Sequence, residues 1–391
     1  MKIGIVLSST PSKSETFFVS KIKFLQKLGH EVILFSHRNN DFSQCKVIQH
    51  PRKKQNVLLQ ILDIFYSLFN IFLKYPKISN RFLNYEKKDG IKFYYRMKNL
   101  YLNQFILMEK LDWLHFGYVT LAIHRENIAK AINSKMGISI RGYDICIYPL
   151  KNIGCYDKVW RKVDKVHSIS NDLLEKAYSY GLKKDTMVQI INPAIDTSLF
   201  KFNKRTSNYN FSNKKIKFLT VARLHWKKGI EYTLEALSIL HKKSIIFEYT
   251  IIGDGLEYER LKFCTHQLGL DNYVRFLRHI EHKKVKKFYN EADIYLQYSI
   301  SEGFCNAVLE SQSQGLLTIV SDAEGLRENV LDNKTGWVVP KRKPKELANK
   351  IKEVLEIDKK KLDRINQNAL KRINNNFTQI KQIREFQKFY K

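Results

Sequence analysis

Residues 292–310 read Ala292-Asp-Ile-Tyr-Leu-Gln-Tyr298-Ser-Ile-Ser-Glu302-Gly-Phe-Cys-Asn-Ala-Val-Leu-Glu310. The first seven residues form an apolar and aromatic run that predicts a buried strand. The run from Asn306 predicts a helix. Glu302 is therefore expected on the loop at the carboxyl end of the strand, and Glu310 on the helix that follows. In an open α/β sheet this edge is where ligands bind.

The start of that helix is a candidate anion site. The backbone amides of Gly303, Phe304 and Cys305 would point toward a ligand docked there. The partial positive charge of a helix N-terminus favours a phosphate group. Two carboxylates beside an anion site suit a ligand that carries both hydroxyl and phosphate groups, and a sugar nucleotide is such a ligand.

The N-terminal part of the chain predicts a βαβ unit. A strand is expected at 3–7, a helix at 16–28 and a second strand at 31–36. The middle, about Arg52 to Tyr101, is helical in pattern and rich in aromatic and basic residues. Further short strands are predicted at 138–140, 145–148, 166–169 and 188–191.

A second series of alternating strands and helices follows. Its strands are predicted at 216–221, 247–252, 273–276, 292–298, 317–321 and 336–339, with helices at 230–241, 257–268, 283–291, from 306 and from 344 onward. The sequence therefore predicts two α/β domains, residues 1–200 and 216–375, joined by a polar linker at 201–215. A helix at 376–391 could pack back on the first domain. The cleft at the junction of two such domains is a common ligand site.

The charge balance is strongly basic. The 391 residues suffice for two cores, and the formal net charge of +30 favours nucleic acid, acidic lipid headgroups or phosphorylated substrates as partners. The five cysteines are scattered and form no CxxC pair, so a reduced, cytoplasmic setting is expected, without a disulfide framework or a zinc site. The apolar stretch 57–73 contains Gln60, Asp63 and Asn70 and is short for a membrane span, so an integral membrane protein is not expected.

Basic residues follow the first strand of the second domain. Arg223 is placed at the carboxyl end of that strand, and Lys228 precedes a glycine that opens a helix. Arginine offers a planar fork for two phosphate oxygens and lysine a point charge, so the two could neutralise a diphosphate leaving group. A solvated basic loop is the alternative. The carboxylate pair at the same sheet edge favours the site.

Two other loops leave alternatives open. Gly253-Asp254-Gly255 ends a strand. It either permits close approach of backbone to a ligand or serves only as a turn and helix cap. Asn192 precedes a proline and is held extended. It either faces the cleft between the domains or belongs to an ordinary turn.

Together these segments resemble the signatures of glycosyltransferase family four, which are retaining enzymes of the GT-B fold. The resemblance rests on Arg223 with Lys228-Gly229, Gly253 to Gly255, Glu302 to Glu310, Asn192 to Asp196, and Ser321 to Val330 with Lys334 to Pro340. In the first domain, Pro11 to Phe17, Leu28 to Val32 and Ile140 to Ile145 are similar to a bacterial subgroup that builds surface polysaccharides of the colanic-acid type. The GT-B fold implies two Rossmann-like parallel-sheet domains facing across a cleft.

The resemblance implies roles for the matched residues. Arg223 and Lys228 would hold the diphosphate, Glu302 would accept hydrogen bonds from the donor sugar, and Glu310 would accept them from the ribose. The remaining donor-binding residues would be Gly303, Phe304 and Cys305 through their amides, His279 and Ile280 beside the nucleobase, and Gly253, Asp254 and Asn192.

The chain departs from the family on the acceptor side. Many relatives have a glycine pair where this chain has Ser12 to Thr16, and many have a histidine where Arg141 stands. Arg141 could instead contact phosphate or an acidic acceptor. The expected acceptor-side residues are Arg141, Asp144, His115, Ser14 and Glu15. A lone histidine such as His115 is more often a satisfied structural residue.

The reaction that the resemblance implies is transfer of a sugar from a nucleoside diphosphate to an acceptor hydroxyl, with the anomeric configuration kept. Uridine and guanosine diphosphate sugars are both compatible donors. The leaving phosphate oxygen could take the acceptor's proton, so Glu302 would position the sugar rather than attack it. No Asp-x-Asp stands beside the candidate site. We therefore expect no metal and no cofactor besides the donor substrate.

The basic and aromatic residues between 52 and 98 suit a peripheral hold on an anionic membrane surface, where a lipid-linked saccharide acceptor would be presented. Alternatively, the aromatic residues are core and the lysines a solvated face. The expected location is cytoplasmic, on the inner face of the cytoplasmic membrane. One rival is a nucleic-acid-binding protein, but no helix-turn-helix, zinc-finger or RNP signature supports it, so no nucleic acid is expected. The other rival is a non-catalytic sugar-nucleotide-binding protein of the same fold.

Overall fold

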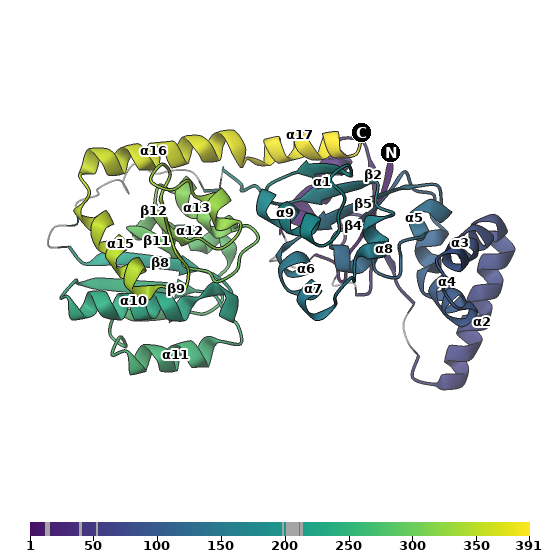
Figure 1. Ribbon diagram of the computed structural model, residues 1–391, viewed down its shortest axis with the longest axis horizontal. Helices are drawn as coiled ribbons and strands as arrows, with labels where there is room; N and C mark the ends of the chain where they lie inside the picture. Colours follow the sequence, from purple (N-terminus) through teal and green to yellow (C-terminus); the bar gives the residue numbers. More distant parts are fainter. Residues whose placement is uncertain (12–15, 39–40, 52–53, 198, 201–210, 212–213) are drawn as a thin grey trace. The chain divides into compact units, whose positions relative to one another are not determined.

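The structure is a computed structural model that describes residues 1–11, 16–38, 41–51, 54–197, 199–200, 211 and 214–391. The chain divides into two compact units, and each contains one parallel sheet with helices around it (Figure 1). Unit 1 comprises Met1–Ile169, Leu173–Ile191 and Ile383–Lys391, and unit 2 comprises Ser170–Asp172 and Asn192–Gln382.

The sheet of unit 1 has seven strands in the order β3-β2-β1-β4-β5-β6-β7. They are β1 (Lys2–Val6), β2 (Glu31–Ser36), β3 (Lys46–Gln49), β4 (Trp113–Phe116), β5 (Lys135–Ile140), β6 (Lys165–Ser168) and β7 (Met187–Ile190). Ile3, Ile5 and Leu114 in its central strands are fully buried, as expected for parallel strands covered on both faces. The strand order reverses between β1 and β4, the type of position at which open α/β sheets bind ligands.

Helices cover the sheet of unit 1 and add a separate layer. They are α1 (Thr16–Lys27), α2 (Val57–Lys74), α3 (Pro76–Lys88), α4 (Phe93–Leu107), η1 (Val119–Ala122), α5 (Ile128–Ala131), α6 (Gly142–Cys146), α7 (Tyr148–Lys151), α8 (Asp157–Trp160) and α9 (Asn171–Ser179). In the added layer α5 packs on β5, α3 and α4 pack on α5, and α2 packs on α3 and α4. Figure 1 shows α2 on the side of this layer away from the sheet.

The sheet of unit 2 has six strands in the order β10-β9-β8-β11-β12-β13. They are β8 (Ile216–Val221), β9 (Phe247–Ile252), β10 (Val274–Leu277), β11 (Ile294–Gln297), β12 (Leu317–Ser321) and β13 (Trp337–Val339). Phe218, Leu296 and Ile319 are buried in its core. The order again reverses at β8, the first strand of unit 2. Its neighbour on the other side is β11, the fourth strand.

The helices of unit 2 lie on both faces of its sheet. They are η3 (Trp226–Lys228), α10 (Ile230–Lys242), α11 (Tyr258–Gln267), α12 (His282–Glu291), α13 (Asn306–Ser313), α14 (Leu326–Asn329), α15 (Pro344–Glu356), α16 (Lys359–Asn376) and α17 (Gln379–Phe389), the last of which ends in unit 1. Residues of α10 and α15 share one apolar cluster, and residues of α12 and α13 share another. This two-layered cover explains why the strands are mostly apolar.

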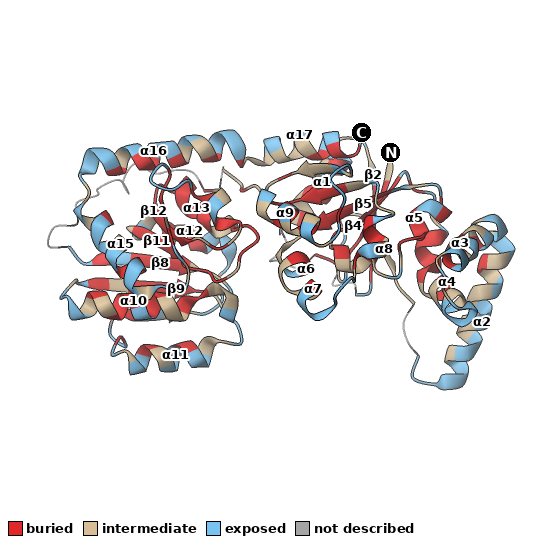
Figure 2. Ribbon diagram, in the orientation of Figure 1, coloured by how far each residue is buried: buried red, intermediate tan, exposed pale blue. Residues whose placement is uncertain are grey.

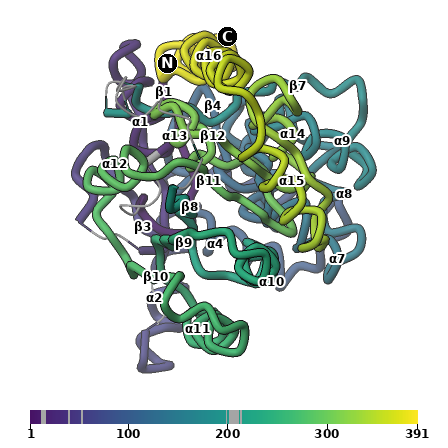
Figure 3. The backbone as a smooth tube through the Cα atoms, turned by 90° about the vertical axis from the view of Figure 1, so that its left-hand side faces the viewer, coloured from purple at the N-terminus to yellow at the C-terminus, as the bar shows by residue number. Residues whose placement is uncertain are grey.

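The last residues of the chain belong to unit 1. Phe386, Phe389 and Tyr390 are buried in the apolar cluster that contains β1 and Trp113. The indole nitrogen of Trp113 donates a hydrogen bond to the Tyr390 carbonyl oxygen at 3.1 Å. Figures 1 and 3 accordingly show the two chain ends close together.

The topology differs from the sequence prediction in three places. Residues 145–148, predicted as a strand, lie in the helices α6 and α7, because a short apolar run does not distinguish a strand from a buried helical turn. The strands β3 and β4 were not predicted. The boundary between the units lies at Ile191 and Asn192 rather than at 200, and most of the predicted linker at 201–215 falls outside the described residues.

Candidate functional site

A buried ion pair lies at the carboxyl edge of the unit 2 sheet. Because β8 and β11 are parallel neighbours, the loops that follow them leave from the same edge. The Lys228 ammonium donates to the Glu302 carboxylate, and the two side chains are only 12 % and 10 % exposed. Burial opposes the charge of Lys228, but the Glu302 charge and hydrogen bond outweigh it and raise the pKa of that lysine. Lys228 is therefore held in its charged form.

The turn after β8 fixes the position of Lys228. Gly229 follows it with a φ of +58°, and a β carbon at this position would lie 2.3 Å from the Tyr298 carbonyl oxygen. Only glycine satisfies both conditions. The amides of Ile300 and Ser301 donate to the Lys227 carbonyl oxygen at 2.7 and 3.3 Å. These contacts tie the loop after β8 to the loop after β11.

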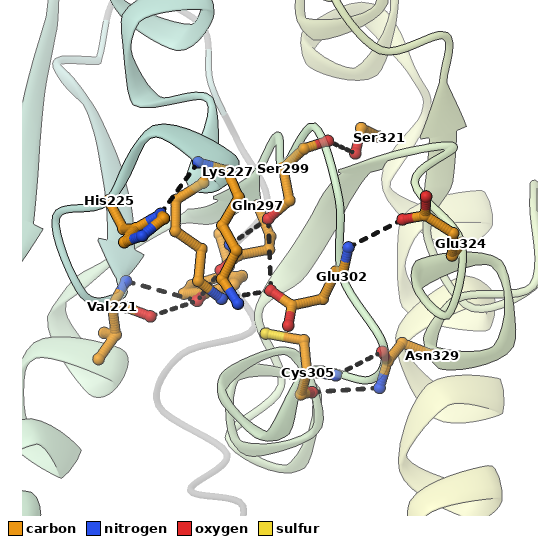
Figure 4. Close-up of polar contacts among 12 residues, drawn as sticks. Val221, His225, Lys227, Gln297, Ser299, Glu302, Cys305, Ser321, Glu324 and Asn329 are labelled. Atoms are coloured by element: carbon orange, nitrogen blue, oxygen red, sulfur yellow. Dashed lines mark hydrogen bonds and ion pairs between the residues drawn. The ribbon is translucent and has the colours of Figure 1, made fainter. Parts of the chain in front are cut away.

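The loop that carries Glu302 is held from the β12 side. The Glu302 amide donates to the Glu324 carboxylate at 2.9 Å, and the Gly325 amide donates to the Glu302 carbonyl oxygen at 2.8 Å. The Ser321 hydroxyl donates to the Ser299 carbonyl oxygen at 2.5 Å. Figure 4 shows the Glu302 side chain pointing from this loop toward the loop of Lys227. The backbone is therefore fixed while the carboxylate faces the lysine.

Helix α13 begins at Asn306, as the sequence predicts. The Cys305 amide donates to the Asn329 side chain at 2.9 Å, and the Asn329 amide group donates back to the Cys305 carbonyl oxygen at 3.1 Å (Figure 4). The prediction that Cys305 lends its amide to a ligand is therefore wrong, because that amide is used within the protein. The amides of Gly303 and Phe304 donate to no acceptor in the described part of the chain, so they stay candidates for the anion site.

Glu310 lies on α13 and is buried. One carboxylate oxygen is 2.8 Å from the His282 imidazole, and the other accepts a hydrogen bond from the Tyr289 hydroxyl at 3.0 Å. The hydrogen bond to Glu310 raises the pKa of His282. A carboxylate has about four acceptor positions. Glu310 therefore keeps acceptor capacity for a ligand hydroxyl while its orientation is fixed.

The loop after β9 approaches the loop after β8. β carbons at Gly253 and Gly255 would lie 1.9 and 2.2 Å from the carbonyl oxygens of Ala222 and Leu224, and both glycines have positive φ. The Asp254 carboxylate accepts from the Gly255 amide at 2.8 Å and pairs with the Arg278 guanidinium at 3.0 Å. These contacts favour the turn interpretation for Asp254.

The other predicted donor-side residues have these positions. Arg223 is exposed on the loop after β8, close enough for its charge to act on Lys228. His279 is exposed and Ile280 half-buried on the loop after β10. Asn192 is half-buried in unit 2, and its carbonyl oxygen accepts from the Gln382 side chain at 2.9 Å.

Sequence reasoning missed four residues that support the site, namely Glu324, Asn329, His282 and Tyr289. Each acts through a partner 21 to 28 residues away in the chain. Glu324 and Asn329 lie in the motif from Ser321 to Val330, but no local spacing signals the partner of any of the four. Within the described ranges, no group of three or more His, Cys, Asp or Glu side chains is placed to hold a metal ion.

Arg141 lies at the end of β5 in unit 1 and is half-buried. Its guanidinium stands over the Phe17 ring at 3.9 Å from the centroid and donates to the Gly117 carbonyl oxygen at 3.2 Å. The predicted acceptor-side residues Ser14 and Glu15 lie outside the described residues.

The other two predicted acceptor-side residues, His115 and Asp144, are 0 % exposed. The prediction that they line an acceptor surface is therefore wrong. His115 belongs to the central strand β4, where the sheet is covered on both faces. Asp144 lies in α6 and accepts a hydrogen bond from the Thr120 hydroxyl at 3.1 Å.

His115 belongs to a buried polar chain in unit 1. The Lys21 ammonium nitrogen lies 3.1 Å from its imidazole, which contacts the Ser139 hydroxyl at 2.8 Å, and that hydroxyl contacts the His167 imidazole at 2.8 Å. The Tyr390 hydroxyl contacts the other His115 nitrogen at 2.9 Å. Burial lowers the pKa of Lys21, and the Arg141 charge adds to this effect. Both imidazole nitrogens of His115 therefore have partners within the protein, and its burial needs no ligand to explain it.

Comparison with known proteins identifies unit 2. Residues 202–372 match the family of glycosyl transferases group 1. The amylovoran biosynthesis glycosyltransferase AmsK of Erwinia amylovora is 26% identical over 243 residues, which are 60% of this chain and 58% of that protein. The putative colanic acid biosynthesis glycosyltransferase WcaL of Salmonella typhimurium is 22% identical over 404 residues, 97% of each chain. The chain thus spans little more than half of AmsK but nearly all of this WcaL.

Solved structures share the fold of the whole chain. The Anabaena protein Alr3699/HepE, crystallised in complex with UDP, superposes with a TM-score of 0.73 over 99% of both chains, at 14% identity. A glycosyltransferase from Rickettsia africae superposes with a TM-score of 0.72 over 100% of this chain and 97% of that one, at 20% identity. The family match covers residues 202–372, which belong to the glycosyl transferases group 1, and the whole chain has the GT-B fold.

Proposed function

We propose that the protein is a retaining, metal-independent glycosyltransferase. It would move a sugar from a UDP- or GDP-linked donor to a hydroxyl of a lipid-linked saccharide during bacterial surface polysaccharide biosynthesis. The observation that carries the proposal is the buried Lys228–Glu302 pair at the carboxyl edge of the unit 2 sheet, beside the start of α13. A cation, a carboxylate and two backbone amides at one edge fit the phosphate and hydroxyl groups of one ligand.

The relatives support the setting and one donor nucleotide. The names of AmsK and WcaL describe glycosyltransferases of amylovoran and colanic acid biosynthesis. HepE has been crystallised with UDP and with UDP-glucose. These names support a role in the assembly of a surface polysaccharide and support UDP as the first donor nucleotide to test.

The chemistry proposed for the site is an exchange of partners. Lys228 is charged and faces Glu302. A donor diphosphate would draw the ammonium to its oxygens, and the released Glu302 carboxylate would accept hydrogen bonds from the sugar hydroxyls. Glu302 thus holds the lysine charged in a buried place until the donor replaces it.

Bond cleavage leaves positive charge on the sugar and negative charge on the diphosphate. Lys228, Arg223 and the amides of Gly303 and Phe304 would stabilise the diphosphate in a partly water-excluded site. The leaving phosphate oxygen takes the proton of the acceptor hydroxyl on the same face of the sugar, so the chain need not supply a base. Neither step calls for a metal ion or a further cofactor.

The acceptor is proposed to be a saccharide carried on a lipid. The protein would then work in the cytoplasm, attached peripherally to the inner face of the cytoplasmic membrane. Support comes from the exposed apolar helix α2 of unit 1.

The test is turnover of a panel of UDP- and GDP-sugars by the full-length protein, with and without membrane lipid extract as acceptor source. Glu302→Gln is expected to reduce turnover about 100-fold or more, the scale seen when a group that stabilises or positions the reacting centre is lost. Glu248→Gln is the matched control, because its carboxylate also pairs with a lysine, Lys215 at 3.1 Å, near the opposite end of the same sheet.

Three outcomes are informative. Wild-type turnover in Glu302→Gln would contradict the site. Donor binding by the wild-type protein with neither hydrolysis nor transfer would leave a non-catalytic sugar-nucleotide-binding protein. Turnover that EDTA abolishes and a divalent cation restores would contradict metal independence.

A further inference from the structure

Helix α2 in unit 1 turns its polar side chains Gln60 and Asp63 toward the protein and exposes large apolar side chains to solvent. The Gln60 side chain donates to the Tyr101 hydroxyl of α4 at 3.0 Å, and that hydroxyl donates to the Asp63 carboxylate at 2.9 Å. The outer face of α2 consists of exposed apolar side chains, namely Leu58, Leu62, Phe65, Tyr66, Phe69 and Leu73. A surface helix of a globular protein normally has the reverse arrangement.

The apolar exposure is large and continues on the neighbouring helix. Ile71 is the buried residue of α2, and Figure 2 shows the helix mostly pale blue and tan along its length. Helix α4, which packs against α2, exposes the aromatic residues Phe93, Tyr94 and Tyr95 in its first turn. Exposed apolar surface of this extent on one region marks an interaction site.

The charges around these helices are basic. Residues 54–98 contain nine Lys or Arg and three Asp or Glu. Each of the three carboxylates is engaged within the protein: Asp63 with Lys54 and Tyr101, Asp89 with Lys162, and the buried Glu86 with Asn99 and Asn127. The outward charge is therefore that of the lysines and arginines, among them the exposed Lys74, Lys87 and Lys88.

A basic hollow of about 570 Å³ lies beside the start of α4. Its lining includes Lys92, Lys98 and Arg125, together with the aromatic Tyr95, and contains no Asp or Glu. A hollow with this lining suits the phosphate of a lipid headgroup. Apolar side chains beside a cationic hollow match the two parts of an anionic lipid.

A second copy of the chain fits this surface less well. Both copies would bring the same basic residues and a net charge of +30 to the contact, so they would repel each other. An anionic bilayer satisfies both the apolar face and the charge.

The geometry also favours a helix that lies on the bilayer over one that crosses it. By length and composition alone α2 could cross a membrane. Its 18 residues span about 27 Å at 1.5 Å per residue, slightly less than the ~30 Å hydrocarbon core. Crossing would also remove Gln60 and Asp63 from Tyr101 and place a carboxylate in hydrocarbon. Lying in the interface keeps these hydrogen bonds.

We propose that α2 lies flat in the interface of an anionic membrane, with its outer face toward the acyl chains and the basic residues of α3 and α4 on the headgroups. This inference rests on the proposed function only for its purpose, since a lipid-linked acceptor would be met at such a surface. The docking itself needs neither donor nor acceptor.

The test is sedimentation of the full-length protein with vesicles of phosphatidylcholine alone and of phosphatidylcholine mixed with phosphatidylglycerol. Binding is expected to the mixed vesicles and to weaken with salt. The variant Leu62→Ser/Phe65→Ser/Phe69→Ser should bind the mixed vesicles at least about tenfold more weakly than the wild type, because it removes apolar area from the contact. The matched control Ile246→Ser/Leu256→Ser/Phe263→Ser removes exposed apolar residues of unit 2 and should bind like the wild type.

Several results would overturn the proposal. These are equal binding to both vesicle types, no binding to either, or wild-type binding by the α2 variant. Retention after an alkaline carbonate wash would indicate a spanning helix. A dimer in solution that the α2 variant disperses would indicate a second copy as the occupant. Donor hydrolysis without vesicles, measured on the same proteins, separates failure of this inference from failure of the proposed transfer.

Discussion

Each unit contains a lysine that is largely shielded from solvent, and the two lysines have opposite surroundings. Lys228 in unit 2 meets the Glu302 carboxylate, which raises its pKa against the effect of burial. Lys21 in unit 1 is 3 % exposed and meets the His115 imidazole, with Arg141 nearby, and burial lowers its pKa. One lysine is held charged at a sheet edge, and the other is driven toward its neutral form inside a core.

The difference shows what separates a candidate phosphate ligand from a structural lysine. A buried cation that a carboxylate keeps charged can exchange that carboxylate for a phosphate. A buried amine among imidazoles and aromatic rings is a weaker candidate, because burial lowers its pKa and no carboxylate offsets that effect. Residue type alone does not distinguish the two; the charge of the partner does.

The largest effect is expected for Lys228→Met. Removing the ammonium should lower kcat/KM for the donor about 100- to 1000-fold, as found when one preorganised group that stabilises developing charge is lost. Steady-state release of nucleoside diphosphate measures it. Lys227→Met, one residue earlier in the same turn, is the control and should stay within a few-fold of the wild type. Equal losses in both variants would indicate damage to the turn rather than to the site.

Asp144→Asn tests a buried carboxylate that no lysine pairs with. Burial raises the pKa of Asp144 to about 7, and in the described residues its Oδ2 atom has no hydrogen-bond partner. The folded protein therefore holds a proton that the unfolded chain releases near pH 4, so stability falls as pH rises from about 4 to about 7.

The neutral asparagine removes this loss. The full pKa shift corresponds to at most about 4 kcal/mol. We expect the free energy of unfolding of the variant to exceed that of the wild type by about 2 kcal/mol at pH 8 and to differ little at pH 4. Urea unfolding at the two pH values measures it. The same difference at both would show that the carboxyl does not titrate as described.

Lys21→Met should change the pH dependence of stability in the other direction. Because the pKa of Lys21 is lowered, the folded protein binds fewer protons than the unfolded chain between its folded-state pKa and about pH 10.5, and its stability rises with pH in that window. Over that window the free energy of unfolding of the wild type should rise relative to that of the variant by up to about 1.4 kcal/mol per pH unit. Unfolding at pH 9 and pH 10, just below the unfolded-state pKa, measures this slope. Lys23→Met, exposed on the same helix, should show none.

The smallest effect is expected for His282→Gln. The pKa of His282 is raised by its hydrogen bond to Glu310, so this contribution to stability is present below about pH 6.5 and is lost as pH rises through the folded-state pKa. Its side chain is 50% exposed, so the contribution is under about 1 kcal/mol. Thermal unfolding at pH 5 and pH 8 should show a deficit of the variant at pH 5 only. A larger deficit at pH 8 would contradict the direction assigned to the pKa shift of His282.

Much of the fold follows from local sequence. The strands of unit 2 and their helices are nearly as predicted, because each buried strand is a short apolar run and each helix begins near a turn or cap signal, as at Gly229. Unit 1 is less regular. Strand β4 was missed since Trp113-Leu-His-Phe116 is short and contains a histidine, whose burial depends on Lys21, Ser139 and Tyr390 from distant parts of the chain.

The candidate site was only partly predictable for the same reason. Lys228 and Glu302 each follow the carboxyl end of a strand that the sequence predicts, and the carboxyl ends of parallel strands lie at one edge of a sheet. The loss of Cys305 as an amide donor depends on Asn329, which lies 24 residues away and shows no local signal. The burial of Asp144 depends on the packing of α6. The last two residues of this helix were predicted as the start of a strand.

The measurement that tests the central claim most directly is calorimetric titration of UDP and GDP, without a sugar, into the wild type, Lys228→Met and Glu302→Gln. If the diphosphate replaces Glu302 at Lys228, Lys228→Met should bind the preferred nucleotide about tenfold or more weakly. Glu302→Gln should bind it at least as tightly as the wild type, because the competing carboxylate is gone and the charge of the diphosphate itself keeps Lys228 protonated. Equal weakening in both variants, or no change in Lys228→Met, would contradict the exchange.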